Sequence, residues 1–540
     1  MRSLVKRVDV QASALAAAAG LIWLLACPRT PDLAAQSYRV GLFERAGFAI
    51  WDNGWYAGHH VPAYSLLFPP LGAELGMRVV GAAAAVLAAF CFARLALSRF
   101  GPGARSGILW FALATASDLA IGRLTYALGA ALGLAALLAL QRGRELPAGV
   151  LAGMTAAATP LAGLFLGLAG TALFVGGRRR MAAVVALPAL GVAAGLALVF
   201  PEGGRQPFGT RALLVSVLLT LAFVALTPDR VLRIGGALYL AATLAAFALV
   251  TPIGGNTTRL GAVLGGPLLL CARSRRTRGG VLDRTGPAVA VVPVVLVGLF
   301  AWQWYAPVRE VTHSLDDRLS REATYRGLFG FLAGHGARAG RVEVPFTRSH
   351  WEAAFVAARY PLARGWEKQL DAGYNGLFFH PNLSSATYHE WLRMLGIRYV
   401  AVATAPSDPS SRAEVRLVLG GVPYLRPVYR DPNWRVFGLT DPEPLASPPA
   451  RMTALGLESF TLRFARPGTS QVRVRFSPYW RATRGCVARA PGGYTQVTAG
   501  DRGPVRVTIA FSLGRVVDPD PRCSAVPRPP APGFSPPPPG

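Results

Sequence analysis

Long apolar runs alternate with short basic segments over residues 1–305 of the chain. A membrane-spanning helix needs about 20 mainly apolar residues. Hydropathy alone predicts about eleven such segments, several of them short. They are 10–27, 77–96, 108–120, 124–140, 146–158, 161–175, 181–200, 213–226, 236–250, 260–272 and 288–304. The pattern therefore predicts a polytopic α-helical membrane domain over residues 1–305.

Arginine clusters follow every second predicted span, as at Arg142 and Arg144 and again at Arg178 to Arg180. Because cytoplasmic loops are enriched in basic residues, this alternation predicts a cytoplasmic N-terminus. An odd number of spans then puts everything after residue 305 on the outer side. The sequence Leu-Leu-Ala-Cys ending at Cys27 loosely resembles a lipoprotein cleavage site. Several spans follow it, however, so a retained first helix is expected.

Composition supports a membrane protein and argues against a nucleic-acid partner. The chain is 52% hydrophobic and only 16% charged, with a mean hydropathy of +0.36. Its net charge of +28 comes almost wholly from arginine, since lysine occurs only at Lys6 and Lys368. No nucleic-acid recognition motif accompanies the charge. Attraction of cytoplasmic arginines to anionic lipid headgroups explains them better.

The remaining residues resemble an ordinary globular sequence and are expected to form two outer domains and a tail. Residues 306–445 are predicted to be α/β, with a helix over 388–395, a strand over 397–403 and a hairpin around Asp431-Pro432-Asn433. Short alternating runs over 446–518 predict a small β-sandwich. Residues 519–540 are proline-rich and are predicted to be a disordered tail.

The five cysteines predict no metal site, because none has the ligand spacing of a zinc centre. Cys27, Cys91 and Cys271 lie in or beside apolar spans, where packing explains them. Cys486 and Cys523 both fall outside the membrane. A disulfide between them is compatible with that compartment.

The first outer loop, residues 28–76, holds the leading candidate for chemistry. Asp32 lies a few residues beyond the first span, at the outer membrane surface. A carboxylate there could take a proton from an attacking hydroxyl, or help to hold a divalent cation on a phosphate. Alternatively, Asp32 simply caps the helix that follows Thr30-Pro31. The sequence leaves both interpretations open.

Two outer-face arginines and two histidines are further candidates. Arg259 stands at an outer turn against the positive-inside trend, and a lipid phosphate is a natural reason for it. Arg123, next to another outer turn, could bind a diphosphate or simply pair with Asp118. His59 and His60 could bind a phosphate or support Asp32. Adjacent histidines point in different directions, so a structural hydrogen-bonding role is the alternative for each.

The loop and the span after it resemble the GT-C superfamily of membrane glycosyltransferases. Members place an aspartate after the first span, then a juxtamembrane helix, then an aromatic and proline-containing approach to the second span. Asp32, residues 33–46 and residues 58–64 follow that order. Residues 146–175, around Thr159-Pro160, resemble a hydrophobic hairpin that is common in the superfamily.

The resemblance implies a bacterial plasma-membrane enzyme with its C-terminal domain outside the cytoplasm. It would transfer a sugar from a polyprenyl-phosphate donor to an envelope glycan, lipid or protein, usually with inversion. Asp32 would be the general base or the contact for a divalent cation such as Mg²⁺ or Mn²⁺. Arg259 and Arg123 would hold the donor phosphate.

The chain departs from the superfamily in one respect. Many members carry two adjacent acidic residues in this loop, whereas here Asp32 stands alone, with Gln36 nearby. Either Glu44 or Asp52 folds back onto Asp32, or the site has lost its metal or its base. A non-catalytic GT-C-like scaffold or lipid-handling protein is therefore the alternative function. A transporter is less favoured, because no internal repeat or mid-span ionisable residue supports it.

Overall fold

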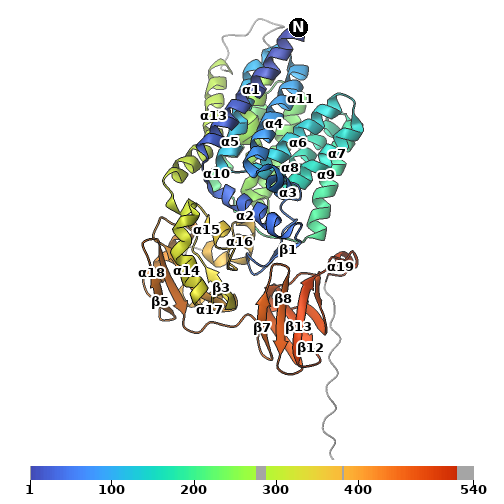
Figure 1. Ribbon diagram of the computed structural model, residues 1–540. Helices are drawn as coiled ribbons and strands as arrows, with labels where there is room; N and C mark the ends of the chain where they lie inside the picture. Colours follow the sequence, from blue (N-terminus) through green and yellow to red (C-terminus); the bar gives the residue numbers. More distant parts are fainter. Residues whose placement is uncertain (1, 275–287, 380–381, 520–540) are drawn as a thin grey trace, which may run out of the picture.

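A computed structural model describes residues 2–274, 288–379 and 382–519 of the chain. A helix bundle occupies one end of the molecule and two strand-containing domains occupy the other (Figure 1). The N-terminus lies at the end of the bundle that is remote from these domains (Figure 1). Cys523 and most of the predicted proline-rich tail lie outside the described residues, and with them the proposed pairing of Cys523 with Cys486.

Each predicted apolar segment coincides with a helix of the bundle. Among these, α1, α4, α6, α9, α11 and α13 are long and apolar enough to cross a membrane. The other helices have 14 to 17 residues. They rise by only about 21–26 Å, less than the roughly 30 Å hydrocarbon core. The positions of the helices are thus confirmed, while the number of complete spans stays a prediction. The bounds are α1 Arg2–Ala26, α4 Met77–Phe100, α5 Arg105–Ile121, α6 Leu124–Gln141, α7 Glu145–Ala158, α8 Pro160–Val175, α9 Arg179–Val199, α10 Thr210–Leu226, α11 Arg230–Ala248, α12 Thr258–Arg273 and α13 Ala288–Leu315.

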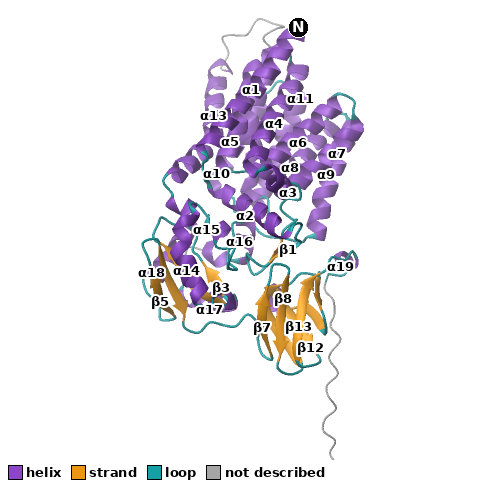
Figure 2. Ribbon diagram, in the orientation of Figure 1, coloured by secondary structure: helices purple, strands orange, loops and turns teal. Residues whose placement is uncertain are grey.

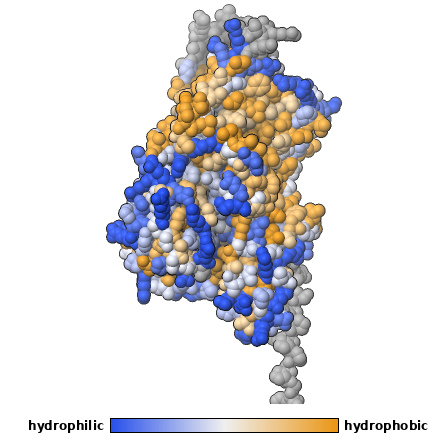
Figure 3. Space-filling model, viewed as in Figure 1, coloured by the Kyte–Doolittle hydropathy of each residue, from blue (hydrophilic) through white to orange (hydrophobic). Residues whose placement is uncertain are grey.

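The surface of the bundle is apolar where a membrane would surround it. Figure 3 shows a hydrophobic belt over the helices, bordered by hydrophilic surface toward the two C-terminal domains. On α9 and α13, side chains such as Leu187, Leu198 and Val294 are 69–70% exposed. A continuous apolar surface of this kind is favourable in lipid and unfavourable in water. The chain is therefore a multi-pass membrane protein.

The first outer loop folds into a compact layer between the bundle and the C-terminal domains. It contains α2 (Pro31–Ala46), a short antiparallel pair of β1 (Trp51–Asp52) and β2 (His59–His60), and α3 (Phe68–Leu75). The order of elements expected from the GT-C resemblance is confirmed. Thr30 is the N-cap of α2, and Asp32 lies within its first turn. Asp32 is thus not the capping residue, although its charge there is favourable to the helix dipole.

The α/β domain, to the left of the other strand-containing domain in Figure 2, is built on a four-stranded sheet. The strand order is β3-β4-β6-β5. β3 and β4 are parallel, and the other pairs are antiparallel. The predicted strand and hairpin are confirmed as β4 and β5-β6, and Gly396 with φ 65° follows the predicted helix, α17. The bounds are β3 Arg341–Glu343, β4 Ile397–Ala403, β5 Leu425–Arg430, β6 Trp434–Leu439, α14 Arg326–Gly334, α15 Glu352–Phe355, α16 Lys368–Tyr374, α17 Ser385–Met394 and α18 Arg412–Leu419.

The second C-terminal domain is the predicted sandwich of two sheets, in the orders β10-β13-β8-β7 and β11-β12-β9. In β8, Phe460, Leu462 and Phe464 alternate toward a core that both sheets share. This period of two is what a sheet with one buried face requires. The bounds are β7 Ala450–Leu455, β8 Ser459–Phe464, β9 Gly468–Arg475, β10 Trp480–Ala482, β11 Cys486–Arg489, β12 Tyr494–Ala499, β13 Gly503–Ile509 and, after the sandwich, α19 Gly514–Val517.

Candidate active site

The start of α2 packs against the turn between α5 and α6. Gly122, in that turn, has φ 90°, and a β-carbon there would lie 2.6 Å from the backbone nitrogen of Leu33. The Thr30 hydroxyl donates a 2.9 Å hydrogen bond to the carbonyl of Ile121. Only glycine combines this conformation with so close an approach. Asp32 lies between Thr30 and Leu33 in the chain. The contact of these two residues with the turn therefore holds Asp32 beside Arg123.

Asp32 and Arg123 form an ion pair at the end of the bundle that faces the C-terminal domains. The Arg123 Nε donates to Asp32 Oδ2 over 3.3 Å. Their side chains remain 31% and 25% exposed, with Asp32 the more open. A carboxylate that is partly exposed and oriented by a guanidinium can still reach a substrate. The structure therefore brings together two residues that the sequence selected separately.

Arg259 and Asp118 complete a cluster of four charged groups. Asp118, near the end of α5, is 5% exposed and lies within electrostatic range of Asp32, Arg123 and Arg259. Arg259, in the first turn of α12, donates a 2.8 Å hydrogen bond to Asn256 Oδ1. Asp118 thus supplies a second carboxylate, from a different element from Asp32. The sequence offered one indication of it, an acidic residue near the end of an apolar span.

Three buried polar atoms around Tyr64 have no hydrogen-bond partner among the described residues. They are Gln36 Oε1, Arg39 Nη1 and Arg259 Nε. The Gln36 amide donates to the Tyr64 hydroxyl over 3.3 Å, and the Arg39 guanidinium lies 3.6 Å from the Tyr64 ring centroid. Tyr64 also interacts electrostatically with Arg259. Buried polar atoms are normally paired, so this group next to Asp32 is suited to bind a polar ligand.

No group of three His, Cys, Asp or Glu side chains that could bind a metal occurs in the described part of the chain. Asp32 and Asp118 nevertheless provide two nearby carboxylates. Mg²⁺ is often held by one or two carboxylates together with phosphate oxygens of a substrate. An ion of that kind would contact Asp32 and would need phosphate oxygens of a substrate to complete its coordination.

Asp52 and Glu44 lie elsewhere in the first outer loop. Asp52 is completely buried and accepts hydrogen bonds from the Tyr38 hydroxyl at 2.9 Å and the Gly54 amide at 2.6 Å. Glu44 is exposed near the far end of α2, about 18 Å along the helix axis from Asp32. Neither carboxylate folds back onto Asp32, so the second acidic group of the cluster is Asp118.

His59 and His60 join the loop to its neighbours. His59 stacks on Trp55, and its Nδ1 lies 3.9 Å from Asp52 Oδ2. His60 Nδ1 lies 2.8 Å from Glu202 Oε1 and its Nε2 lies 3.0 Å from the Ser477 hydroxyl. The contacts given above for both histidines are with residues other than Asp32. These contacts fit the structural hydrogen-bonding role that was the alternative for each histidine.

The chain of Ser477, His60 and Glu202 resembles a hydrolytic triad in connectivity, but Ser477 is 0% exposed. A nucleophile must reach its substrate, so this arrangement is a structural link between the first loop, the α9–α10 connection and the sandwich. Burial alone would raise the pKa of Glu202, but hydrogen bonds from His60 hold that pKa below its ordinary value.

No protein-family model and no curated protein matches the chain. Among solved structures, it is similar to the mycobacterial arabinofuranosyltransferase AftD, determined by single-particle cryo-EM, with 14% identity and a TM-score of 0.44. It is also similar to the structure of an AftD mutant, with 14% identity and a TM-score of 0.43. The similarity covers 93% of this chain but only 57% and 60% of the two AftD chains, less than two thirds of their length. At this identity the likeness concerns the fold alone, and it assigns no role to any residue of this chain.

Proposed function

We propose that the chain is a GT-C-type membrane glycosyltransferase of a bacterial plasma membrane. It moves a sugar from a polyprenyl-phosphate donor to a glycan, lipid or protein acceptor of the cell envelope. The end of the bundle that carries the C-terminal domains faces outward. The proposal rests on the partly exposed Asp32 carboxylate, paired with Arg123 beside Asp118 and Arg259.

In the proposed reaction, Asp32 accepts the proton of an acceptor hydroxyl as its oxygen attacks the anomeric carbon of the sugar. The bond between that carbon and the phosphate oxygen breaks, and its electron pair leaves with the polyprenyl phosphate. Attack opposite to the leaving group inverts the anomeric configuration. The proton ends on Asp32, and the acceptor oxygen gains the sugar.

Arg123 and Arg259 have the charge that the leaving group needs. Negative charge grows on the phosphate as the glycosidic bond breaks, and fixed guanidinium groups stabilise it without reorganising. Charge-assisted hydrogen bonds of this type are stronger than neutral ones. The unpaired Nε of Arg259 is available for such a bond. A divalent cation held by Asp32 and Asp118 would neutralise further charge on that phosphate.

Asp118 also bears on the alternative of a non-catalytic scaffold. That alternative drew its support from the single carboxylate of the first outer loop. The structure adds a second carboxylate in the same cluster, from α5. The reason for preferring a scaffold is thereby weakened.

Donor consumption tests the proposal. Purified protein in lipid is given a panel of radiolabelled polyprenyl-phosphate sugars, with an envelope extract as acceptor. The Asp32→Asn variant is compared with Glu44→Gln, which removes an exposed carboxylate of the same helix. We expect wild type and Glu44→Gln to release label from the lipid, and Asp32→Asn to lose that activity.

Two other outcomes would contradict parts of the proposal. Turnover by Asp32→Asn would remove Asp32 from the catalytic step while keeping an enzyme. A lack of turnover by wild type across a broad panel would favour the scaffold.

A further inference from the structure

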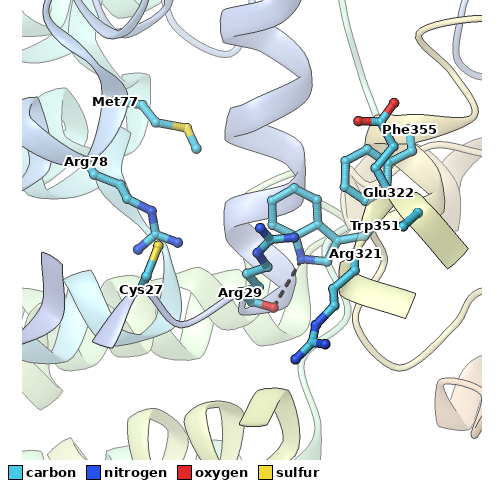
Figure 4. A pocket seen from close by; sticks show the side chains of 9 residues that line it. Cys27, Arg29, Met77, Arg78, Arg321, Glu322, Trp351 and Phe355 are labelled. Carbon is cyan, nitrogen blue, oxygen red and sulfur yellow. Dashed lines mark hydrogen bonds between the residues drawn. The ribbon is translucent and has the colours of Figure 1, made fainter. Parts of the chain in front are cut away.

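A hollow lies where the membrane bundle meets the α/β domain. It has a volume of about 470 Å³, within the range of small-ligand sites. Met77 and Arg78 of α4 line one side, Trp351 and Phe355 the other, and Arg29 lies between them (Figure 4). Because α4 is a membrane-spanning helix that begins at Met77, the hollow lies at the depth of lipid headgroups.

The hollow is distinct from the Asp32 cluster, although Arg29 and Asp32 are close in sequence. Arg29 donates a 2.7 Å hydrogen bond to the carbonyl of Ser320 in the α/β domain. Asp32 pairs instead with Arg123 of the membrane bundle. Arg29 and Asp32 therefore have different partners, in different domains. The role proposed for the Asp32 cluster does not account for the arginines that line the hollow.

Three arginines give the hollow an excess of positive charge. Arg29 is close enough to Arg78 to repel it electrostatically, and Arg321 adds a third, exposed guanidinium. The one acidic lining residue, Glu322, already pairs with Arg359 at 2.6 Å. An anion between the guanidinium groups would offset the repulsion.

Arg78 retains a hydrogen-bond donor for such an anion. Its Nη2 donates to the carbonyl of Pro28 over 2.6 Å, which holds the side chain in place. Its Nη1 is buried and has no partner among the described residues. A phosphate oxygen is the strong acceptor that this geometry suits.

The remaining surface is apolar, which favours a lipid over a free anion. Met77, Trp351 and Phe355 line the hollow. Close to it in sequence, Leu25 is 76% exposed and Val79 is 55% exposed on the adjoining helices. Acyl chains could lie on these side chains while the phosphate reaches the arginines, whereas inorganic phosphate would gain nothing from them.

We propose that this hollow binds the phosphate headgroup of an anionic lipid from the leaflet next to the C-terminal domains. Arg78 and Arg321 contact the phosphate, and Arg29 orients the site from the loop before α2. The site is lined by none of the residues of the Asp32 cluster and does not depend on the proposed sugar transfer. It differs from the donor site, whose phosphate is assigned to Arg123 and Arg259.

Lipid retention tests the inference. Full-length protein in detergent is titrated with phosphatidylglycerol or phosphatidylcholine, and bound lipid is counted by native mass spectrometry. We expect wild type to retain phosphatidylglycerol preferentially. The double variant Arg78→Gln/Arg321→Gln should bind it at least tenfold more weakly. Arg321→Gln alone, at an exposed position that folding tolerates, should weaken binding about threefold, since a surface charge contact contributes modestly.

The controls separate this site from the others. Arg326→Gln removes an exposed arginine outside the hollow and should bind like wild type, as should Asp32→Asn. Equal retention of both lipids, or undiminished retention by the Arg321→Gln and double variants, would overturn the proposal. Stabilisation of lipid-free protein by millimolar inorganic phosphate, to the extent that phosphatidylglycerol stabilises it, would overturn the assignment to a lipid.

Discussion

The Asp32 carboxylate accepts a hydrogen bond from the Arg123 guanidinium, from a residue 91 positions later in the chain. The pair joins the helix of the first outer loop to the turn between two bundle helices. It leaves Asp32 oriented but accessible. Arg259, the other cation of the cluster, is free of a direct bond to Asp32 and is the better placed to hold a phosphate.

Arg259→Gln is therefore expected to weaken donor binding more than it slows the chemical step. A hydrogen bond to a charged group is worth about 1.5–3 kcal/mol, which corresponds to roughly a tenfold to hundredfold rise in KM for the donor. Steady-state kinetics with varied donor would measure it. Arg205→Gln, an exposed arginine of the α9–α10 connection, is the control. An unchanged KM in Arg259→Gln would exclude Arg259 from the phosphate site.

Gly122→Ala is expected to abolish most turnover by moving α2. The new methyl group would collide with the Leu33 backbone, so the Asp32–Arg123 pair would separate. Gly143 is a matched control, because it also has a positive φ, of 71°, but no atoms within 4 Å of its would-be β-carbon. Gly143→Ala should cost about 1–2 kcal/mol of stability from backbone strain and keep its activity. Equal turnover by the two variants would argue against the close approach as the positioning device.

Ser477→Ala is expected to loosen the sandwich without loss of catalysis. Loss of its hydrogen bond to His60 should cost about 1 kcal/mol. Faster amide hydrogen exchange over residues 450–509 would report it, while donor consumption stays within about twofold of wild type, a difference below 1 kcal/mol. The pKa of Glu202 is lowered in the folded protein, so its ionised carboxylate contributes fully to folding stability above pH 4.5. That contribution to stability is lost as the pH falls through the lowered pKa. Abolished turnover in Ser477→Ala would instead show that the serine acts chemically.

Glu343→Gln is expected to make the α/β domain more stable at alkaline pH. One guanidinium, Arg364, lies among three buried carboxylates, those of Asp371 at 2.7 Å, Glu414 at 3.2 Å and Glu343 at 3.9 Å. Burial, with repulsion from Glu414, raises the pKa of Glu343 well above 4.5. The folded state then holds a proton that the unfolded state has lost. The contribution of Glu343 to folding stability is therefore fully present below pH 4.5. It is lost as the pH rises through the raised pKa of Glu343.

Melting temperatures at pH 5 and pH 8 would check this expectation. Wild type should lose stability between the two values, and Glu343→Gln should lose less. Glu390→Gln, at an exposed position of α17, should behave like wild type. A variant that loses as much stability as wild type would mean that Glu343 is ionised in the fold.

Much of the fold could be predicted because it depends on local periodicity. Apolar runs located the bundle helices, and Thr159-Pro160 located the break between α7 and α8. Alternation predicted the strands of the sandwich, such as β8. The number of membrane spans was harder to predict from the sequence. Helices such as α7 are shorter than the hydrocarbon core of a bilayer, and their depth in the membrane depends on packing against other helices.

The candidate site was only partly predictable, because its members are distant in sequence. Asp32, Arg123 and Arg259 could be selected one by one from their position and charge. Asp118 could be noticed as an acidic residue near the end of an apolar span, but nothing local shows that α5 ends beside α2. The roles of Asp52 and His60 depend on Tyr38, Glu202 and Ser477, and the pairing of His60 with Ser477 spans 417 positions.

These long-range bonds impose an order on biogenesis. The ribosome synthesises the first outer loop early. Glu367, the buried partner of Arg39, is synthesised 328 residues after it, and Ser477, the partner of His60, is synthesised later still. Until then the loop carries charged and polar groups that the finished protein buries. A truncated or stalled chain would display this unpaired surface, which would let quality-control proteases distinguish unfinished molecules from mature ones.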